Sequence, residues 1–308
     1  MKTTIAIVAW GAGADILYAT PIVRKIREEN PCAHITWIVR DIFADLVATN
    51  PYIDAVKEVY LPSFEKDKQS NEYVMDQMAH AIATSPTYDK CYYLQYWPRF
   101  TNFYENPNED FISLRARNAG IDPSSIKDRR PILMVTDADK KAVDDKFSNL
   151  DWSKVITCNH ISYAASPCWS FAQYGDLAIR LKDVNLNIMF TGAHHERIPT
   201  ISTSSTKTDD LNREIEVYTD AIDARGLPFR QWAKCISRSS LWLGLDSGAV
   251  AFACSTNVPI IKLHSPDFPI RKTGIKAMGL RTDDKVLELC PAPSVETVFN
   301  LIMKMRRQ

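Results

Sequence analysis

The sequence has no excess charge of either sign, no closely paired cysteines and no long apolar run. Lysine plus arginine and aspartate plus glutamate each number 37, so no net field attracts nucleic acid. None of the seven cysteines forms a C-x-x-C pair, which disfavours a zinc cluster or a disulfide framework and favours a reducing cytoplasm. The opening "MKTTIAIVAW" reaches its glycines too soon for a secretory signal, and no run has the ~20 apolar residues that span a bilayer. We expect a soluble cytoplasmic protein, at most peripheral to a membrane.

What the chain does have is length and a regular alternation of apolar patterns. Its 308 residues, 45% of them hydrophobic, suffice for two domains. Strands alternating with helices indicate βαβ units and parallel sheets, hence an α/β fold. The predicted strands are 5–9, 34–39, 55–60, 90–95, 132–135, 155–159, 186–191, 241–245 and 259–263. The predicted helices are one following Asp15, 43–48, 73–83, 109–119, one from 138, 171–181, 229–237, one from 249, and 295–305.

A polar stretch, "IKDRRPILMVTDADKKAVDDKFSNLD", separates two runs of this alternation. We place the domain boundary near residue 150, which gives domains 1–150 and 151–308, each with a β-loop-α start. The last helix, about 295–305, is a candidate for packing back on the first domain. Ligands in open α/β sheets bind beyond the carboxyl ends of the strands, so two such edges facing one another would define a cleft.

The first β-loop-α start carries an acid where a phosphate-binding loop has none. After the apolar run "TTIAIVAW", Gly11 and Gly13 fit a dinucleotide fingerprint, but its third glycine position is Ile16, and no Walker lysine follows. Asp15 has two interpretations, which can coexist. It can cap the following helix, or it can project into the cleft as a general base.

The surrounding residues resemble the start of the family 9 glycosyltransferases, which include bacterial heptosyltransferases of lipopolysaccharide synthesis. That family begins with a pattern like G-x-x-G-D-x-x-x-x-x-P, then a strand, then a phrase close to N-P-x-I-D. "GAGADILYATPIVRKIREENPCAHITWIV" and the later "NPYIDAV" match it at Gly11, Asp15, Pro21 and within 50–54. Ala14 stands where the family has glycine.

The second half resembles the donor-binding part of the same family. "AIDARGLPFRQWAKCISRSSLWLGLDSGAVAFACSTNVPIIKLHSP" follows the order of a helix, a strand, D-S-G, another helix and V-P-V-V. "CWSFAQYGDLAIRL" resembles the family's K-x-W-P segment. The resemblance extends from about residue 4 to 266.

The resemblance implies a GT-B architecture, with two Rossmann-like parallel-sheet domains facing across a cleft. It also implies inverting transfer without a metal, with Asp15 as the base that deprotonates the acceptor hydroxyl in the first domain. The second domain would hold the donor. The donor residues that it implies are Asp246, Ser247 and Gly248 at the D-S-G turn, Leu227 against the base, Glu196 near the ribose, and Ser162 at a phosphate.

The chain departs from the family pattern at three positions. The histidine after D-S-G is Ala251, the lysine before the W-P phrase is Pro167, and the proline of that phrase is Ser170. Other cations can replace the missing donor contacts, and the candidates are Lys262, Arg271 and Lys272. A changed donor and a degenerate member are the alternatives.

The resemblance predicts transfer of a heptose or related sugar from a nucleoside diphosphate to a glycan or glycolipid such as lipopolysaccharide core. No cofactor, no metal and no nucleic-acid partner is expected. The predicted location is the cytoplasm, with peripheral contact at the inner membrane left open. A sugar-nucleotide epimerase of similar shape and a catalytically weak nucleotide-sugar binding protein are the rival hypotheses.

Two motifs are expected to be decoys or secondary features. "TDADKK" contains the D-A-D of another glycosyltransferase fold, but its position favours a helix start, and His194, His195 and Glu196 lack the H-E-x-x-H spacing. The end of "CYYLQYWPRF", 96–100, is a candidate lining for the acceptor side because Trp and Tyr faces suit sugar rings.

Overall fold

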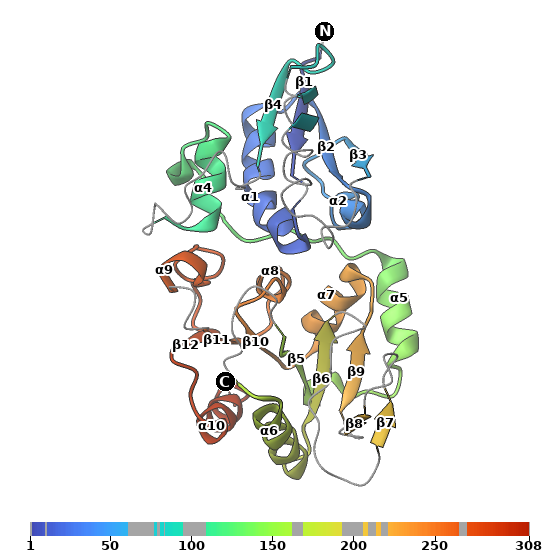
Figure 1. Cartoon of the computed structure of the whole chain (residues 1–308), viewed down its shortest axis with the longest axis vertical. Helices are drawn as coiled ribbons and strands as arrows, with labels where there is room; N and C mark the ends of the chain where they lie inside the picture. Colours follow the sequence, from blue (N-terminus) through green and yellow to red (C-terminus); the bar gives the residue numbers. More distant parts are fainter. Residues whose placement is uncertain are drawn as a thin grey trace. The chain divides into compact units, whose positions relative to one another are not determined.

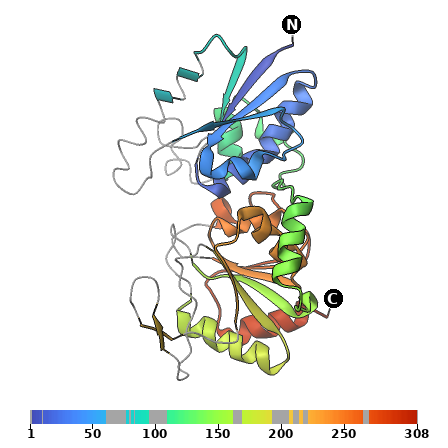
Figure 2. The same ribbon diagram turned by 90° about the vertical axis from the view of Figure 1, so that its right-hand side faces the viewer.

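The computed structural model describes most of the chain and divides it into two compact units. The described residues are 2–9, 11–60, 77–78, 81–82, 84–94, 109–161, 169–192, 206–208, 214–216, 221–264 and 270–307. Unit 1 comprises Met1–Met134 and Arg271–Leu280, and unit 2 comprises Val135–Ile270 and Arg281–Gln308. Each unit has its own sheet with helices packed beside it (Figures 1 and 2).

Unit 1 contains a parallel sheet of order β3-β2-β1-β4. Its strands are β1 (Thr4–Val8), β2 (His34–Arg40), β3 (Ala55–Val59) and β4 (Lys90–Tyr93). Its helices are α1 (Gly13–Glu29), η1 (Asp41–Phe43), α2 (Ala44–Val47), α4 (Phe111–Asn118) and η2 (Pro123–Ser125). The β1–α1 connection therefore leaves the carboxyl edge of a central strand.

Unit 2 contains a larger parallel sheet of order β12-β11-β10-β5-β6-β9, and a separate antiparallel pair, β7 with β8. The strands are β5 (Val155–Asn159), β6 (Asn187–Gly192), β7 (Thr206–Thr208), β8 (Glu214–Glu216), β9 (Ile222–Arg225), β10 (Leu241–Leu245), β11 (Ile260–Leu263) and β12 (Val286–Leu289). The helices are α5 (Asp137–Lys146), η3 (Trp152–Lys154), α6 (Phe171–Asp183), α7 (Phe229–Arg238), α8 (Ala249–Cys254) and α10 (Val295–Met305). Helix α9 (Ile270–Thr273) begins at the last residue of unit 2 before the chain passes into unit 1.

The predicted α/β architecture is confirmed, and it is most accurate where the strands are buried on both faces. Every residue of β5 and β10 is buried, and both strands have the predicted bounds. Strands covered by helices on both sides consist of nearly continuous apolar residues, so their limits are visible in the sequence. The amphipathic α10 also has its predicted bounds.

The predicted strand at 132–135 is wrong. This apolar segment has no secondary structure, and the backbone N–H of Ile132 donates to the Thr20 hydroxyl of α1 at 2.8 Å instead of to a neighbouring strand. An extended apolar run becomes a strand only where a partner strand supplies the ladder. The predicted helix 73–83 falls largely outside the described residues.

The division between the units comes at Met134, ahead of the predicted boundary near residue 150. Helix α5 therefore belongs to unit 2, where Arg230 of α7 pairs with its Asp139 at 2.7 Å and Arg238 pairs with its Asp144. Helix α10 also belongs to unit 2, where Arg180 of α6 bonds to its Glu296. The C-terminal segment that the structure assigns to unit 1 is Arg271–Leu280 instead of α10.

Candidate functional site

Asp15 lies in the first turn of α1, directly beyond the carboxyl end of β1. Ala12 is the N-cap of this helix, so Asp15 is not the N-cap residue, but it contributes to capping α1 from the N3 position. Asp15 is the third helical residue, and its Oδ2 accepts the backbone N–H of Ala12 at 3.0 Å. Its Oδ1 lies 2.5 Å from Nη2 of Arg115. The carboxylate is thus held by one amide and one guanidinium.

Arg115 is a site residue that the sequence analysis missed. It lies on α4, which Asp110 caps by accepting the N–H groups of Ile112 and Ser113. The Arg115 side chain is fully buried, and its Nη1 donates to the Phe111 carbonyl at 3.2 Å. The guanidinium carbon lies 5.9 Å from the ring centroids of both Tyr18 and Phe111. These contacts fix the cation that faces Asp15.

The environment of Asp15 suits a group that takes up a proton. Burial raises the pKa of this carboxyl, and the opposing effects of Arg115 and the Ala12 N–H offset only part of that rise. The side chain retains 17% exposure, so a ligand can reach it. A partly desolvated carboxylate with a raised pKa is a stronger base than an ordinary aspartate, as general-base catalysis requires.

The D-S-G turn of unit 2 follows β10 and is built by hydrogen bonds within the protein. The Ser247 hydroxyl donates to Oδ1 of Asn159 at 2.8 Å and accepts the N–H of Ala249 at 3.3 Å. Asn159, at the end of β5, also donates to the Thr191 carbonyl at the end of β6, at 3.3 Å. Asn159 therefore links the turn after β10 to the ends of β5 and β6. A polar residue ending the buried run "VITCN" was the signal for Asn159.

Gly248 is exposed at this turn, and its backbone has an ordinary conformation, with φ of −54° and ψ of −26°. The N–H groups of the first residues of α8 already have acceptors, since Val250 donates to the Ser247 carbonyl at 3.1 Å and Ala251 to that of Gly248 at 3.2 Å. These amides therefore point to acceptors within the protein.

Asp246 belongs to a buried group of charged side chains at the same edge. Its Oδ1 lies 2.9 Å from Nζ of Lys262, and its Oδ2 lies 3.7 Å from Nδ1 of His264. Nε2 of His264 in turn lies 2.9 Å from Oε1 of Glu288. We call these four residues the Asp246 cluster. Neither His264 nor Glu288 was predicted from the sequence.

The strand registers explain this cluster. Gly244, Lys262 and Glu288 are register partners on β10, β11 and β12. Asp246 and His264 come two residues after the first two, and residues two apart in a strand point to the same face. The Lys262 side chain is fully buried, so it is not positioned to contact a ligand directly. It acts on this edge of the sheet through Asp246.

The remaining predicted residues have varied positions. Leu227 is partly buried and packs on a cluster that includes Val143 and Trp152, so part of its apolar surface belongs to the core. Ala251 is fully buried, and Ser170 is the N-cap of α6. Ser162, Glu196, Pro167, His194, His195 and residues 96–100 lie outside the described residues, as do the side chains of Arg271 and Lys272.

The D-A-D motif has the expected helix-start role. Asp139 accepts the backbone N–H of Thr136 at 3.1 Å and its hydroxyl proton at 2.5 Å, and it pairs with Arg230. Within the described part of the chain, no group of three or more His, Cys, Asp and Glu side chains is placed to hold a metal ion. In the same part, no helix is both long and apolar enough to cross a bilayer.

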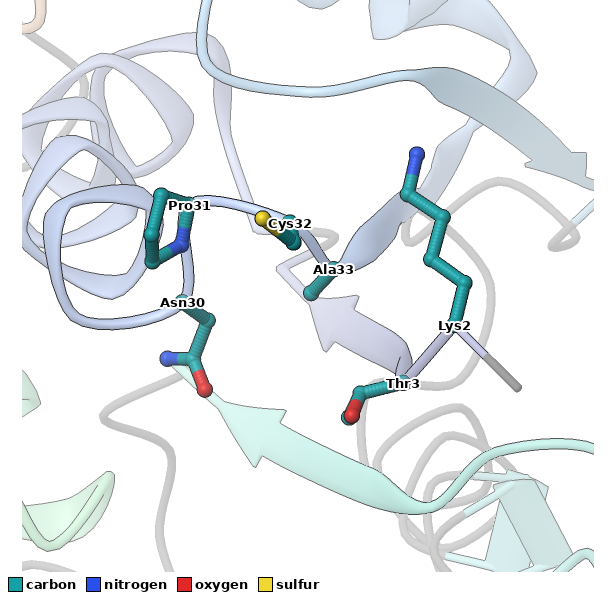
Figure 3. Close-up of a pocket in the computed structure, with 6 residues that line it drawn as sticks. All are labelled: Lys2, Thr3, Asn30, Pro31, Cys32 and Ala33. Carbon is teal, nitrogen blue, oxygen red and sulfur yellow. The ribbon is translucent and has the colours of Figure 1, made fainter.

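A pocket of about 640 Å³ opens at the other edge of the unit 1 sheet (Figure 3). It is lined by Lys2, Thr3, Asn30, Pro31, Cys32 and Ala33, which precede β1 and β2. Asp15 follows the carboxyl end of β1, so the pocket and Asp15 lie at opposite ends of that strand. The pocket is not part of the candidate site.

Solved structures with the same fold include nucleotide-sugar enzymes. A family 9 glycosyltransferase from Veillonella parvula shares 14% sequence identity and a TM-score of 0.67, and the match covers 100% of this chain and 98% of that one. The ADP-heptose LPS heptosyltransferase II of E. coli shares 14% identity and a TM-score of 0.62, with 100% and 99% covered. The chain has the GT-B fold. The structural resemblance expected from the sequence is thereby confirmed.

The same fold occurs in a different class of enzyme. A putative UDP-N-acetylglucosamine 2-epimerase from Listeria monocytogenes shares 13% identity and a TM-score of 0.56, with 100% of this chain and 89% of that one covered. No protein-family model matches the chain, and no curated protein sequence does. At these identities the likeness concerns the fold, so function depends on the site residues.

Proposed function

We propose that the protein is a glycosyltransferase that moves a sugar from a nucleoside diphosphate to an acceptor hydroxyl. The observation that carries this proposal is Asp15, a partly buried carboxylate with a raised pKa at the carboxyl edge of β1 in a GT-B fold. A helix start does not require a desolvated acid paired with a buried arginine, whereas a base benefits from both.

In the proposed reaction the acceptor oxygen attacks the anomeric carbon of the donor sugar. Asp15 takes the hydroxyl proton as the new C–O bond forms and the bond to the diphosphate breaks, so the anomeric configuration inverts. Arg115 keeps the carboxylate ionised and oriented until the proton arrives. A base must lie within hydrogen-bond reach of the attacking oxygen, and the partial exposure of Asp15 permits that approach.

We assign the donor to unit 2, at the carboxyl edge where Asp246, Ser247 and Gly248 form the turn. Open α/β sheets bind ligands at this edge. Leu227, Glu196 and Ser162 keep their proposed places near the base, the ribose and a phosphate. Lys262 acts on the donor by holding Asp246. The proposed donor sugar is a heptose or a relative, and the proposed acceptor is a glycan or glycolipid such as lipopolysaccharide core.

The proposed setting is the cytoplasm, with the acceptor presented at the inner face of the membrane, and the proposed transfer needs no metal ion. Rate measurements in EDTA test the last point. We expect an unchanged rate, because cationic side chains and backbone amides are proposed to neutralise the leaving diphosphate. Loss of activity that Mg²⁺ or Mn²⁺ restores would contradict metal-independent transfer.

A thermal-shift series with ADP-, GDP- and UDP-sugars tests the proposed function, since a ligand that binds the native state raises its apparent stability. We expect one nucleotide class to stabilise the protein, and its nucleoside diphosphate to be released when acceptor glycan is added. Failure of every class to bind would contradict the proposal. Conversion of the donor into an epimer, without transfer, would select the second candidate function, which the epimerase of the same fold supports.

A further inference from the structure

The Asp246 cluster contains more ionisable groups than are needed to anchor a turn. One lysine and Asp246 already form a close pair at 2.9 Å, with Lys262 fully buried. The structure adds a second pair, His264 with Glu288, and places Nδ1 of the imidazole 3.7 Å from Oδ2 of the same aspartate. Burying ions costs free energy unless each is compensated, so the second pair requires an explanation.

His264 is the member of the cluster that exchanges a proton near neutral pH. Charged groups face it from each packed strand: Asp246 after β10, Lys262 on its own β11, and Glu288 on β12. Burial lowers the pKa of His264, but the carboxylates of Asp246 and Glu288 outweigh that effect and raise it above its ordinary value. The imidazolium of His264 therefore persists to higher pH than that of an ordinary histidine, and in this form Nε2 donates to Glu288.

The protonation state of His264 decides the charge beside the turn. With His264 protonated, the four groups carry two positive and two negative charges, and Asp246 has a cation on each oxygen. Without that proton the same four groups carry a net charge of −1, and Oδ2 of Asp246 loses its facing cation. An added negative charge in a partly desolvated site repels an anionic ligand.

We propose that His264 is a pH-sensitive positioning residue, whose imidazolium holds Asp246 beside the 246–248 turn and whose deprotonation weakens binding of the donor diphosphate. This inference rests on the proposed function for the identity of the ligand. The coupling between His264 and the turn is independent of that function, because both lie at the same edge of the sheet. Alkaline pH therefore acts on donor binding through this residue.

The coupling can be measured on the free protein by NMR. We expect the backbone amide signals of Ser247 and Gly248 to titrate with the same midpoint as the His264 imidazole. His264→Gln should abolish that step, and Glu288→Gln should move it to lower pH by removing a stabilising anion. His34→Gln, which replaces an exposed histidine at the amino end of β2, is the matched control and should change nothing. A turn that titrates independently of His264, or not at all, would overturn the proposal; the wild-type titration decides this even if the variants fail to fold.

Binding is measured by calorimetry with ADP-glucose, GDP-mannose and UDP-glucose, whose phosphates stay fully ionised over the range used. We expect affinity for the sugar nucleotide that binds to fall roughly three- to tenfold as pH rises through the His264 midpoint, as one added charge predicts. The loss should disappear in His264→Gln and persist in His34→Gln. A wild-type affinity that is independent of pH would refute the effect on the diphosphate. Binding by none of the three would count against the proposed function, while the NMR titration would still judge the coupling.

Discussion

The two units place an aspartate at the same point of the same motif, yet they surround it differently. Asp15 follows β1 of unit 1 and faces one buried cation, Arg115, which comes from a separate helix. Asp246 follows β10 of unit 2 and faces two cationic groups from the adjacent strand, Lys262 and His264. Asp15 is left able to accept a proton, whereas Asp246 is enclosed by groups that favour its charge. The same position beyond a strand thus serves a base in one unit and an anchor in the other.

The largest effect that distinguishes the two acids is expected for Asp15→Asn. The amide keeps the size of the side chain but cannot take the proton of the acceptor hydroxyl. General-base assistance contributes ~10²–10⁴-fold to the rate. We expect that loss in turnover with donor affinity nearly unchanged, measured by nucleotide release and calorimetry. The control is Asp128→Asn, which breaks the surface pair with Arg24 in the same unit and should leave turnover intact. More than about a tenth of wild-type turnover in Asp15→Asn would exclude the base role.

The next largest effect is expected on stability, in Lys262→Met. Removing the lysine leaves Oδ1 of Asp246 beside a neutral side chain while His264 still faces Oδ2, and breaking a buried pair costs about 3–5 kcal/mol. Chemical denaturation should therefore show a markedly lower midpoint. Lys140→Met, which breaks an exposed pair with Asp137 in the same unit, should leave the midpoint where it is. Equal effects of the two variants would mean that Lys262 does not anchor Asp246.

A smaller effect, on pH dependence, is expected for Arg115→Gln. Arg115 opposes the rise in the pKa of Asp15 that burial causes, so its removal raises that pKa further. The base must be ionised to act, and kcat/KM falls as pH drops through its pKa. The acid limb of the profile should therefore move to higher pH. Arg115→Lys, which retains the charge, should restore most of the wild-type profile, and a limb that stays in place would show that Arg115 does not act on the base.

Sequence reasoning located the central strands of both sheets better than it located the partners of the acids. Strands β5 and β10 were predicted with their bounds because both faces are buried. The edge strands β9 and β12 were missed, since "IDAR" and "VLEL" are only partly buried and have no continuous apolar run. Patterns in sequence report burial, and these two strands have less of it than β5 and β10.

The partners of the acids could not be read from local patterns. Arg115 lies 100 residues from Asp15, and within "FISLRARN" it looks like a solvated helix residue. His264 and Glu288 meet only because β11 and β12 are adjacent in register. In "IIKLH" the residues Lys262 and His264 are two apart, which places them on the same face at the end of β11. This alternation is a signal in the sequence for the partners of Asp246.

The smallest expected effect concerns the exposed residue of the donor turn. Gly248 has a backbone conformation that any residue adopts, so Gly248→Ala and Gly248→Val should fold normally. Their side chains would occupy space that the diphosphate is proposed to approach, and donor affinity should fall in the order of side-chain size, by about tenfold for valine (~1.4 kcal/mol). Calorimetry with the nucleoside diphosphate that binds measures this, and turnover at saturating donor should stay near wild type. Because the first amides of α8 already have internal acceptors, the turn has less to offer a phosphate than a longer helix would. Unchanged affinity in Gly248→Val, together with a large loss in Arg271→Ala, would move the diphosphate from this turn to the segment that follows β11.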